Sequence, residues 1–368
     1  MISNSTLTVN LDTIAQNASA IKRALNGAEL IPVLKGNAYG HGQAEIYSAL
    51  RPAIEGGHIA VAHMSEAAVL CEAGCSERIM LVSGFPTDAI SEALDMNVIL
   101  PIGDPVTAKA VSDAASGAVS VQIKLNCGLN RFGAKPGAEL DELIRTIKLL
   151  PKLNVVGVYT HFSLIDHIDR PAAQTELNRF LDGVSQLSAA GINPPLRHAA
   201  ASNVSEWYPE SHLDACRVGR RLFIGPPAEG AADDGTITES GTWSSTVTAL
   251  KHLSAGERFG YGGTFEAKRP TEIAILGVGH ADGVVAELCA VGAPILIDGR
   301  RGRLIGANMD CCYVDVTECG ARVGSEVIFF GHSATGAVLT VREVAATIGA
   351  EGVFLTSKLT SRVNRKYL

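Results

Sequence analysis

Short apolar runs alternate with amphipathic stretches from about residue 12 to residue 225, and this alternation restricts the possible folds more than any other feature of the chain. A short apolar run between turn residues is typical of a buried strand, whereas apolar residues three and four positions apart are typical of a helix with one buried face. The expected strands are Leu30–Leu34, His58–Ala62, Arg78–Val82, Asn97–Ile102, Val119–Leu125, Val155–His161, Leu196–Ala200 and Cys216–Gly219, and the helical stretches between them include Ser65–Ala73, Ala138–Leu150 and Ala172–Ala190. Eight such units predict an α/β fold, a closed (β/α)8 TIM-type barrel with functional residues at the C-terminal ends of its strands.

The alternation ends near residue 225, and a different pattern follows. The stretch Pro226–Gly235 has the composition of a linker. Beyond it helical signals thin out, and the pair Asp298-Gly299 predicts a tight hairpin among short apolar runs. Those runs are Glu272–Gly277, Pro294–Ile297, Tyr313–Val316 and Glu326–Phe330. We therefore expect a barrel domain over residues 10–227 and a C-terminal, mostly β domain over residues 228–368, to which residues 1–9 can add a strand.

Charge and composition point to small-molecule chemistry. The net charge of −7 and the lack of a basic run argue against nucleic acid and against an anionic membrane as partners. Neither a signal-peptide pattern nor a membrane-spanning apolar segment is found, so a cytoplasmic protein is expected. The 8 cysteines are scattered and are expected to be reduced. Cys71 and Cys75 are close in sequence, but no second ligand pair follows them, and no metal site is predicted.

Lys35 is the strongest candidate for a reactive residue. It lies in VLKGNAYGHG, from Val33 to Gly42, where one amine ends an apolar run and a glycine-rich loop over residues 36–42 is expected to follow. An amine in that position is partly desolvated, which lowers its pKa and lets it bind an aldehyde cofactor covalently and later act as a base. The alternative is a strand-end lysine that only extends into solvent.

Other polar residues at predicted strand ends are ambiguous when each is taken alone. Lys124 and Arg131, two cations with a glycine between them, follow the fifth strand and could belong to a solvated turn. His161 closes the sixth strand, a place where a hydrogen-bonded core histidine is common. Tyr261 lies between glycines in the second domain and could simply pack on a turn.

Taken together, these segments resemble the alanine racemases, a family that uses pyridoxal 5'-phosphate (PLP). The resemblance extends from about residue 5 to residue 368, and the motifs keep their order. They are VLKGNAYGHG at Lys35, KLNCGLNRFG at Lys124–Gly133, YTHFS at His161, RHAAAS at Arg197–Ser202, CRVGR at Cys216–Arg220, FGYGGTF at Tyr261, and Met309-Asp310. The resemblance implies an amino-acid racemase, an isomerase that makes D-amino acids and works as a homodimer with active sites at the subunit interface.

The resemblance also implies that Lys35 carries PLP and that several other residues hold the cofactor. These are Tyr39, Ser202 and the N–H groups of Gly219 and Arg220 at the phosphate, His161 at the ring, Arg217 at the pyridine nitrogen, and His198 behind Arg217. Backbone N–H groups at a chain turn suit a phosphate group.

For the reaction itself, the resemblance implies two bases on opposite faces of the α-carbon, Lys35 and Tyr261 of the partner subunit. Arg131 and the amide of Met309 correspond to the groups that bind the substrate carboxylate. Lys124 corresponds to a lysine that holds this arginine and is often carbamylated in the family.

The expected substrate entrance departs from the family pattern. His280 and Val353 replace tyrosines, Ala286 and Ala307 stand where arginines are common, and Ala201 replaces an asparagine. These changes remove bulk and positive charge, so we expect a wider pocket, and the loss of one contact changes selectivity by roughly 1–3 kcal/mol.

Racemisation of alanine is the expected activity, with serine or a broader set of amino acids as the alternative. A PLP-dependent decarboxylase of the same fold is a further alternative, although such an enzyme is expected to place an acid where Arg217 stands. A non-catalytic PLP-binding protein is the third, and the presence of both Lys35 and Tyr261 argues against it.

Overall fold

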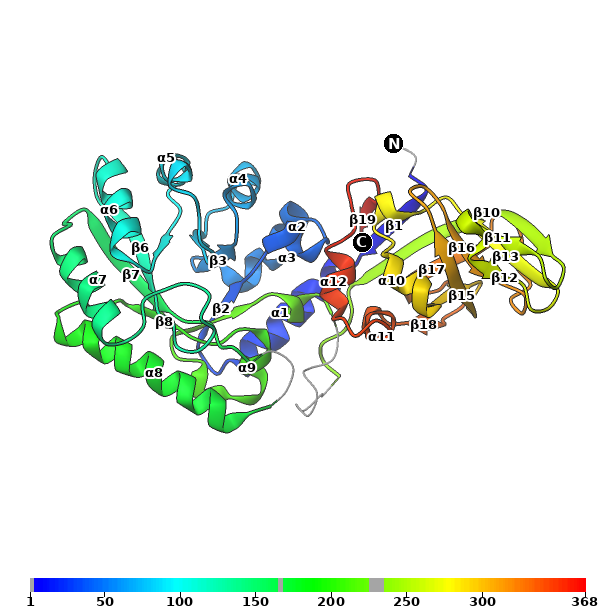
Figure 1. Cartoon of the computed structure of the whole chain (residues 1–368). Helices are drawn as coiled ribbons and strands as arrows, with labels where there is room; N and C mark the ends of the chain where they lie inside the picture. Colours follow the sequence, from blue (N-terminus) through cyan, green and yellow to red (C-terminus); the bar gives the residue numbers. More distant parts are fainter. Residues whose placement is uncertain (1–2, 165–167, 225–234) are drawn as a thin grey trace.

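The computed structural model describes residues 3–164, 168–224 and 235–368, and the chain forms two parts that lie side by side (Figure 1). Eight parallel strands make the N-terminal part: β2 Glu29–Pro32, β3 His58–Val61, β4 Arg78–Leu81, β5 Leu100–Ile102, β6 Val119–Lys124, β7 Leu153–Tyr159, β8 Leu196–His198 and β9 Ala215–Val218. Regular ladders join β2 to β9, β3 to β4, and β5 through β8 in order. Single parallel bridges, Val33 to Ala60, Met80 to Ile99 and Ala201 to Arg217, link these groups and close the ring. The predicted (β/α)8 barrel is confirmed.

Helices cover the outside of this barrel (Figure 1). They are α1 Leu11–Ala24, α3 Gln43–Ile54, α4 Met64–Glu72, α5 Ile90–Asp95, α6 Pro105–Ala114, α7 Ala138–Lys148, α8 Arg170–Ala189 and α9 Ser202–Trp207. In α7 the residues Leu140, Leu143, Ile144 and Ile147 are buried. This spacing of three and four residues gives the helix a single apolar face, which packs toward the sheet.

All eight predicted strands are present, with ends that differ by a few residues. The sixth ends at Tyr159, so His161 lies just beyond it. The loop expected after Lys35 was wrong in part, because Lys35–Tyr39 form one helical turn, α2. The predicted linker lies outside the described residues except for Gly235.

The C-terminal part is mostly β, as predicted. Its main strands are β10 Gly241–Leu253, β13 Thr271–Leu276, β14 Pro294–Ile297, β15 Arg300–Ala307, β16 Cys312–Asp315, β17 Glu326–His332 and β18 Val338–Leu339, with the short pair β11 Arg258–Phe259 and β12 Phe265–Glu266 and the helices α10 Ala286–Val291, α11 Val341–Ala346 and α12 Gly352–Thr356. β17 pairs with β10 as well as with β14, so the sheet closes on itself. Asp298 and Gly299, at φ 47° and 80°, join β14 to β15, and two positive φ angles are what a tight two-residue hairpin needs.

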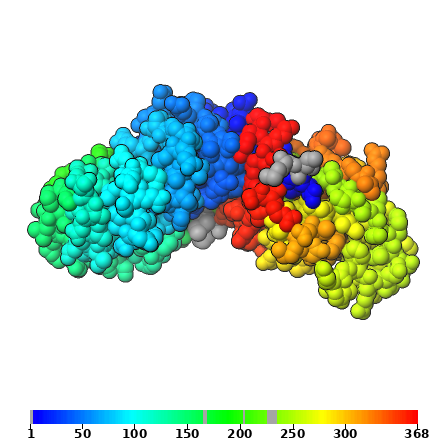
Figure 2. Space-filling view, turned by 90° about the horizontal axis from the view of Figure 1, so that it is seen from above, coloured from blue at the N-terminus to red at the C-terminus, as the bar shows by residue number. Residues whose placement is uncertain are grey.

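Both ends of the chain belong to this second sheet. β1 (Ser5–Val9) pairs with β10 and with the last strand, β19 (Asn364–Tyr367). The C-terminal segment lies between the barrel and the rest of the β part (Figure 2). All eight cysteines are free. Among the described residues, no helix combines the length and apolar character needed to cross a membrane.

Candidate active site

A cavity of about 110 Å³ opens at the C-terminal ends of the barrel strands. It is lined by Val33, Lys35, Tyr39, Ala62, Val82, Ser83, Arg131, Tyr159, His161, Ala201, Ser202, Arg217 and Gly219. Seven residues named from the sequence are thereby brought together: Lys35, Tyr39, Arg131, His161, Ser202, Arg217 and Gly219. The barrel geometry explains this convergence, because parallel strands all end on the same rim.

Lys35 reaches the cavity from an unusual turn. Gly36, Asn37 and Ala38 in α2 have φ angles of 62°, 54° and 53°, so the turn is left-handed. That conformation costs roughly 1–2 kcal/mol for each residue with a side chain, and such strain is concentrated at functional sites. The carboxylate of Glu66 helps to fix the turn by accepting a hydrogen bond from the N–H of Gly36 at 2.6 Å. Burial, followed by the charge of Arg131, lowers the pKa of Lys35, which increases its fraction of neutral amine.

Tyr39, Ser202 and Gly219 meet at one wall of the cavity. The N–H of Gly219 donates to Ser202 Oγ at 3.0 Å. A Cβ atom at Gly219 would lie 2.2 Å from the hydroxyl oxygen of Tyr39, so only glycine permits this approach. Burial raises the pKa of Tyr39, which therefore keeps its proton and can act as a hydrogen-bond donor. The side chain of Arg220 does not line the cavity and instead pairs with Glu351.

Arg217 is 3% exposed, and its hydrogen-bond acceptors are neutral groups. Its guanidinium donates to His198 Nδ1 at 2.8 Å and to the carbonyl oxygens of His198, Thr160 and Ala199 at 2.7, 2.6 and 3.0 Å. His198 Nε2 lies 3.1 Å from Gln122 Oε1. That oxygen only accepts, so Nε2 carries the proton and Nδ1 is free to accept from Arg217. Burial lowers the pKa of Arg217 to about 10, and the group remains a cation at neutral pH.

His161 and Tyr159 lie close to the positively charged Arg217. Burial, and then the charge of Arg217, holds the pKa of His161 well below its ordinary value, so the imidazole is neutral at pH 7. The buried ring of Tyr159 stacks on His198, with centroids 5.1 Å apart, and its hydroxyl has no hydrogen-bond partner among the described residues. Tyr159 was not among the site residues predicted from the sequence. The available signal was its position two residues before His161, which places both on one side of an extended strand.

Lys124 and Arg131 occupy different environments. Lys124 ends β6 and is buried, and its amine donates to the carbonyl of Leu125 at 2.6 Å. Burial, followed by the charge of Arg217, lowers the pKa of Lys124 to about 7. Arg131 lies on the loop after β6 with its guanidinium over the ring of Phe132, 5.8 Å from the centroid, and lines the cavity.

The cavity is electropositive and suits an anionic ligand. Lys35, Arg131 and Arg217 line it, whereas none of its lining residues is Asp or Glu. The Tyr159 hydroxyl, which has no hydrogen-bond partner among the described residues, adds a donor to the lining. Nowhere in residues 3–164, 168–224 and 235–368 do three or more His, Cys, Asp or Glu side chains cluster as metal ligands would.

Tyr261 and Met309 do not line this cavity. Tyr261 is 81% exposed in a turn between β11 and β12, at the end of the molecule away from the barrel (Figure 1). Met309 is 61% exposed in the loop between β15 and β16. Within one chain, these two predicted residues are therefore not brought to Lys35.

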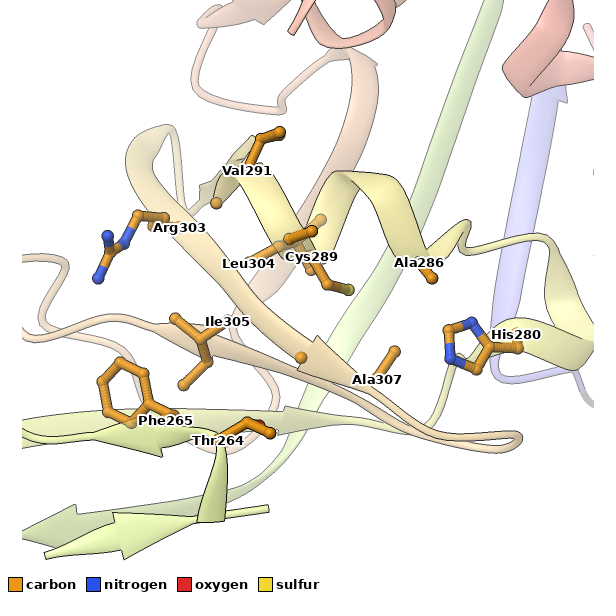
Figure 3. Close-up of a pocket in the computed structure, with 13 residues that line it drawn as sticks. Thr264, Phe265, His280, Ala286, Cys289, Val291, Arg303, Leu304, Ile305 and Ala307 are labelled. Carbon is orange, nitrogen blue, oxygen red and sulfur yellow. The ribbon is translucent and has the colours of Figure 1, made fainter. Parts of the chain in front are cut away.

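A separate cavity of about 440 Å³ lies in the C-terminal part (Figure 3). His280, Ala286 and Ala307, three of the predicted entrance positions, line one end of it, and Arg303 lies at the other end. The Nδ1–H of His280 donates to the carbonyl of Val284 at 2.7 Å, which fixes the ring. Val353 is not part of this cavity, and Ala201 lines the cavity at the barrel rim instead.

Comparison with known proteins supports a single family. Residues 9–227 match the model of the alanine racemase N-terminal domain, and residues 241–367 match that of the C-terminal domain. The chain is 34% identical to an alanine racemase of Desulforamulus reducens, with 98% of both chains covered, and 33% identical to one of Symbiobacterium thermophilum, with 98% and 96% covered. Among solved structures, the alanine racemase of Bacillus anthracis with bound L-Ala-P is similar at a TM-score of 0.93 and 25% identity, covering 100% of this chain and 96% of that one. The biosynthetic alanine racemase of Pseudomonas aeruginosa is similar at 0.86 and 30%, with both chains fully covered. The chain belongs to the alanine racemase family and is an amino-acid racemase.

Proposed function

We propose that this protein interconverts L- and D-alanine with PLP bound at Lys35. The observation that carries the proposal is the cavity at the barrel rim, where Lys35 lies among cations that have no acidic neighbour in the lining. Such a site favours a ligand with a phosphate group and a substrate with a carboxylate. The relatives named alanine racemase support alanine as the substrate.

The residues present fit PLP. Its phosphate would be held by Tyr39, Ser202 and the N–H groups of Gly219 and Arg220, with His161 against the ring and Arg217 at the pyridine nitrogen. When bound, the cofactor withdraws electrons from the substrate and makes its α-hydrogen acidic. Arg217 keeps its proton at neutral pH, so it offers a hydrogen bond to the ring nitrogen and does not protonate it. An arginine at this place argues against the decarboxylase alternative.

Proton transfer needs one base on each face of the α-carbon. Lys35 has a lowered pKa and can take or return a proton on one face. We assign the other face to Tyr261 of the partner subunit, in a homodimer. The 81% exposure of Tyr261 supports this, because a tyrosine that serves a second chain must be accessible in the first.

The substrate carboxylate is assigned to Arg131 and to the amide of Met309 of the partner subunit. In the loop that holds Met309, Asn308 Oδ1 accepts the N–H groups of Asp310 and Cys311 at 2.9 and 2.7 Å. These bonds fix the loop around Met309. Lys124 supports Arg131 in this scheme, and its lowered pKa favours the neutral amine that reacts with carbon dioxide to give a carbamate and a proton.

The division of the chain is part of the same proposal. We assign residues 10–227 to a PLP-binding domain and residues 228–368 to a β domain that includes β1. The two family models, which match residues 9–227 and 241–367, support this division.

Incubation of the PLP-loaded protein with L-alanine tests the proposal. We expect equal amounts of L- and D-alanine at equilibrium, resolved by chiral chromatography. Protein with the substitution Lys35→Ala is the matched control and should leave L-alanine unchanged. If the parent protein binds PLP but leaves L-alanine unconverted, the non-catalytic alternative is favoured.

A further inference from the structure

A second cavity, of about 520 Å³, opens directly beside the first. The two share Lys35, Tyr39 and Ala62. The far wall of the second cavity comes from α12 and includes Val353 and Phe354. Any ligand bound covalently or by hydrogen bonds at Lys35 therefore borders both spaces.

The two acidic side chains of the second cavity, Glu66 and Glu351, are bound to other groups of the protein. Both carboxylate oxygens of Glu66 accept backbone N–H groups, from Gly36 at 2.6 Å and from Ala62 and His63 at 2.8 and 3.1 Å. Glu351 pairs with Arg220. Because these carboxylates are bound elsewhere, the walls offer mainly carbon to a ligand, and burial of apolar surface is the interaction that they can provide.

The wall formed by α12 is held firmly against the barrel. The guanidinium of Arg365 donates twice to the carbonyl of Gly40, at 3.2 and 3.1 Å. A Cβ atom at Gly40 would lie 2.0 Å from the carbonyl oxygen of Thr356, so the end of α12 is in close contact with the turn that carries Lys35. The position of this wall is therefore fixed by its contacts with the barrel, and its side chains decide how far it projects into the cavity.

We propose that this second cavity receives the side chain of the substrate, and that the enzyme racemises amino acids with longer aliphatic side chains, such as methionine and leucine, as well as alanine. The inference rests on the proposed function, since it places the amino acid at Lys35. A cavity of about 150 Å³ is enough for a benzene ring, so a space of about 520 Å³ is much larger than a methyl group needs. Val353 and Phe354 are the residues that determine specificity.

The first test compares specificity constants for L-alanine, L-methionine, L-leucine and L-glutamate in the PLP-loaded parent. We expect kcat/KM for methionine and leucine to lie within about tenfold of the alanine value and glutamate to be at least tenfold poorer than methionine, as a missing or unfavourable contact commonly changes this ratio by roughly 10–200-fold. Activity on alanine alone would overturn the inference while leaving the proposed function intact. Lack of activity on every amino acid would reject both.

The second test fills the cavity. Val353→Tyr should shift the ratio of kcat/KM values toward alanine over methionine by at least about tenfold. Val323→Tyr is the matched control, because Val323 is 64% exposed and lines neither cavity. Calorimetric titration with α-methylmethionine, which lacks the α-hydrogen and cannot be racemised, gives a readout independent of turnover. Val353→Tyr should weaken its binding about tenfold relative to α-methylalanine, and an unchanged ratio in both measurements would overturn the assignment.

Discussion

Arg217 illustrates how the site works at the scale of single residues. A buried guanidinium without a carboxylate is costly, and the four hydrogen bonds that it donates to neutral groups reduce that cost without neutralising the charge. The positive charge therefore remains available to a ligand. Gln122 completes this arrangement by fixing the tautomer of His198, so the proton on His198 faces away from Arg217.

Loss of the amine at position 35 should abolish covalent cofactor binding. We expect Lys35→Ala to lose the visible absorbance of bound PLP, because no other amine lines the cavity within the described residues. Lys109→Ala, which removes an exposed lysine on α6, is the control. Borohydride reduction followed by peptide mass mapping identifies the attachment site, and a label on any other lysine would contradict the assignment.

Gly219 permits close contact with Tyr39, and a single methyl group should disturb it. The Cβ atom added by Gly219→Ala would lie 2.2 Å from the tyrosine hydroxyl, so the substitution must displace Tyr39. We expect PLP affinity to fall at least about tenfold, roughly 1.4 kcal/mol, measured by equilibrium titration. Gly117→Ala, where no atom lies within 4 Å of the added carbon, should bind PLP like the parent.

Lys35 could be predicted from the sequence because it stands at a strand end, and strand ends in a barrel converge, whereas His161 and Arg217 were named through the resemblance to the alanine racemases. Their hydrogen-bond partners could not be predicted in this way. The partners of Arg217 come from the ends of different strands, and the exact end of each strand decides which carbonyl is available. Tyr159 was missed although its spacing from His161 was a signal, and its lack of a hydrogen-bond partner among the described residues is visible only in three dimensions.

At the scale of elements, the eight barrel strands were predicted. The left-handed helical turn α2, which follows the first of them, β2, was not. Apolar runs mark strands reliably, whereas a left-handed turn through Asn37 and Ala38 contradicts local propensity. Contacts from distant parts of the chain stabilise it, including Glu66 on α4 and Arg365 near the C-terminus. A local sequence pattern contains no information about such contacts.

His41, which follows this turn, should make the protein sensitive to acid. Its ring stacks on Phe223 at 4.7 Å, its Nδ1–H donates to the carbonyl of Ala38, and burial lowers its pKa to about 4. Because the folded pKa lies below the unfolded value of about 6.5, the unfolded chain binds the proton first. Stability is therefore retained above about pH 6.5 and falls as the pH drops toward 4, by roughly 2–3 kcal/mol from this residue.

Urea unfolding of the parent and of His41→Asn at pH 7 and pH 4.5 measures this effect. Asparagine can keep a donor near Ala38 but does not titrate. The variant should be less stable at pH 7, because the smaller side chain leaves a cavity, and should lose less stability between the two pH values. Equal losses in both proteins would show that other groups cause the acid sensitivity.

At the scale of the whole molecule, the chain ends connect the two parts. β1 and β19 belong to the C-terminal sheet, although α1 and the barrel follow directly after β1. α12 then returns to the barrel rim and supplies Val353 beside Lys35. The sequence motifs indicated each part, but only the folded chain shows that β11 and β12, which flank the turn of Tyr261, lie away from the barrel (Figure 1).

Mixed dimers test whether Tyr261 serves the other chain. Lys35→Ala should be inactive, and Tyr261→Phe should be slower by roughly 10²-fold or more, as expected when a general acid or base is lost. If each site combines Lys35 of one chain with Tyr261 of the other, a dimer of the two variants contains one intact site and one doubly defective site. Random reassociation of equal amounts makes half of the dimers mixed, so activity should recover to about one quarter of the parent value. Mixing either variant with itself is the control and should give no recovery. Failure to recover activity, with mixed dimers confirmed by native mass spectrometry, would mean that Lys35 and Tyr261 act within one chain and that a rearrangement must bring them together.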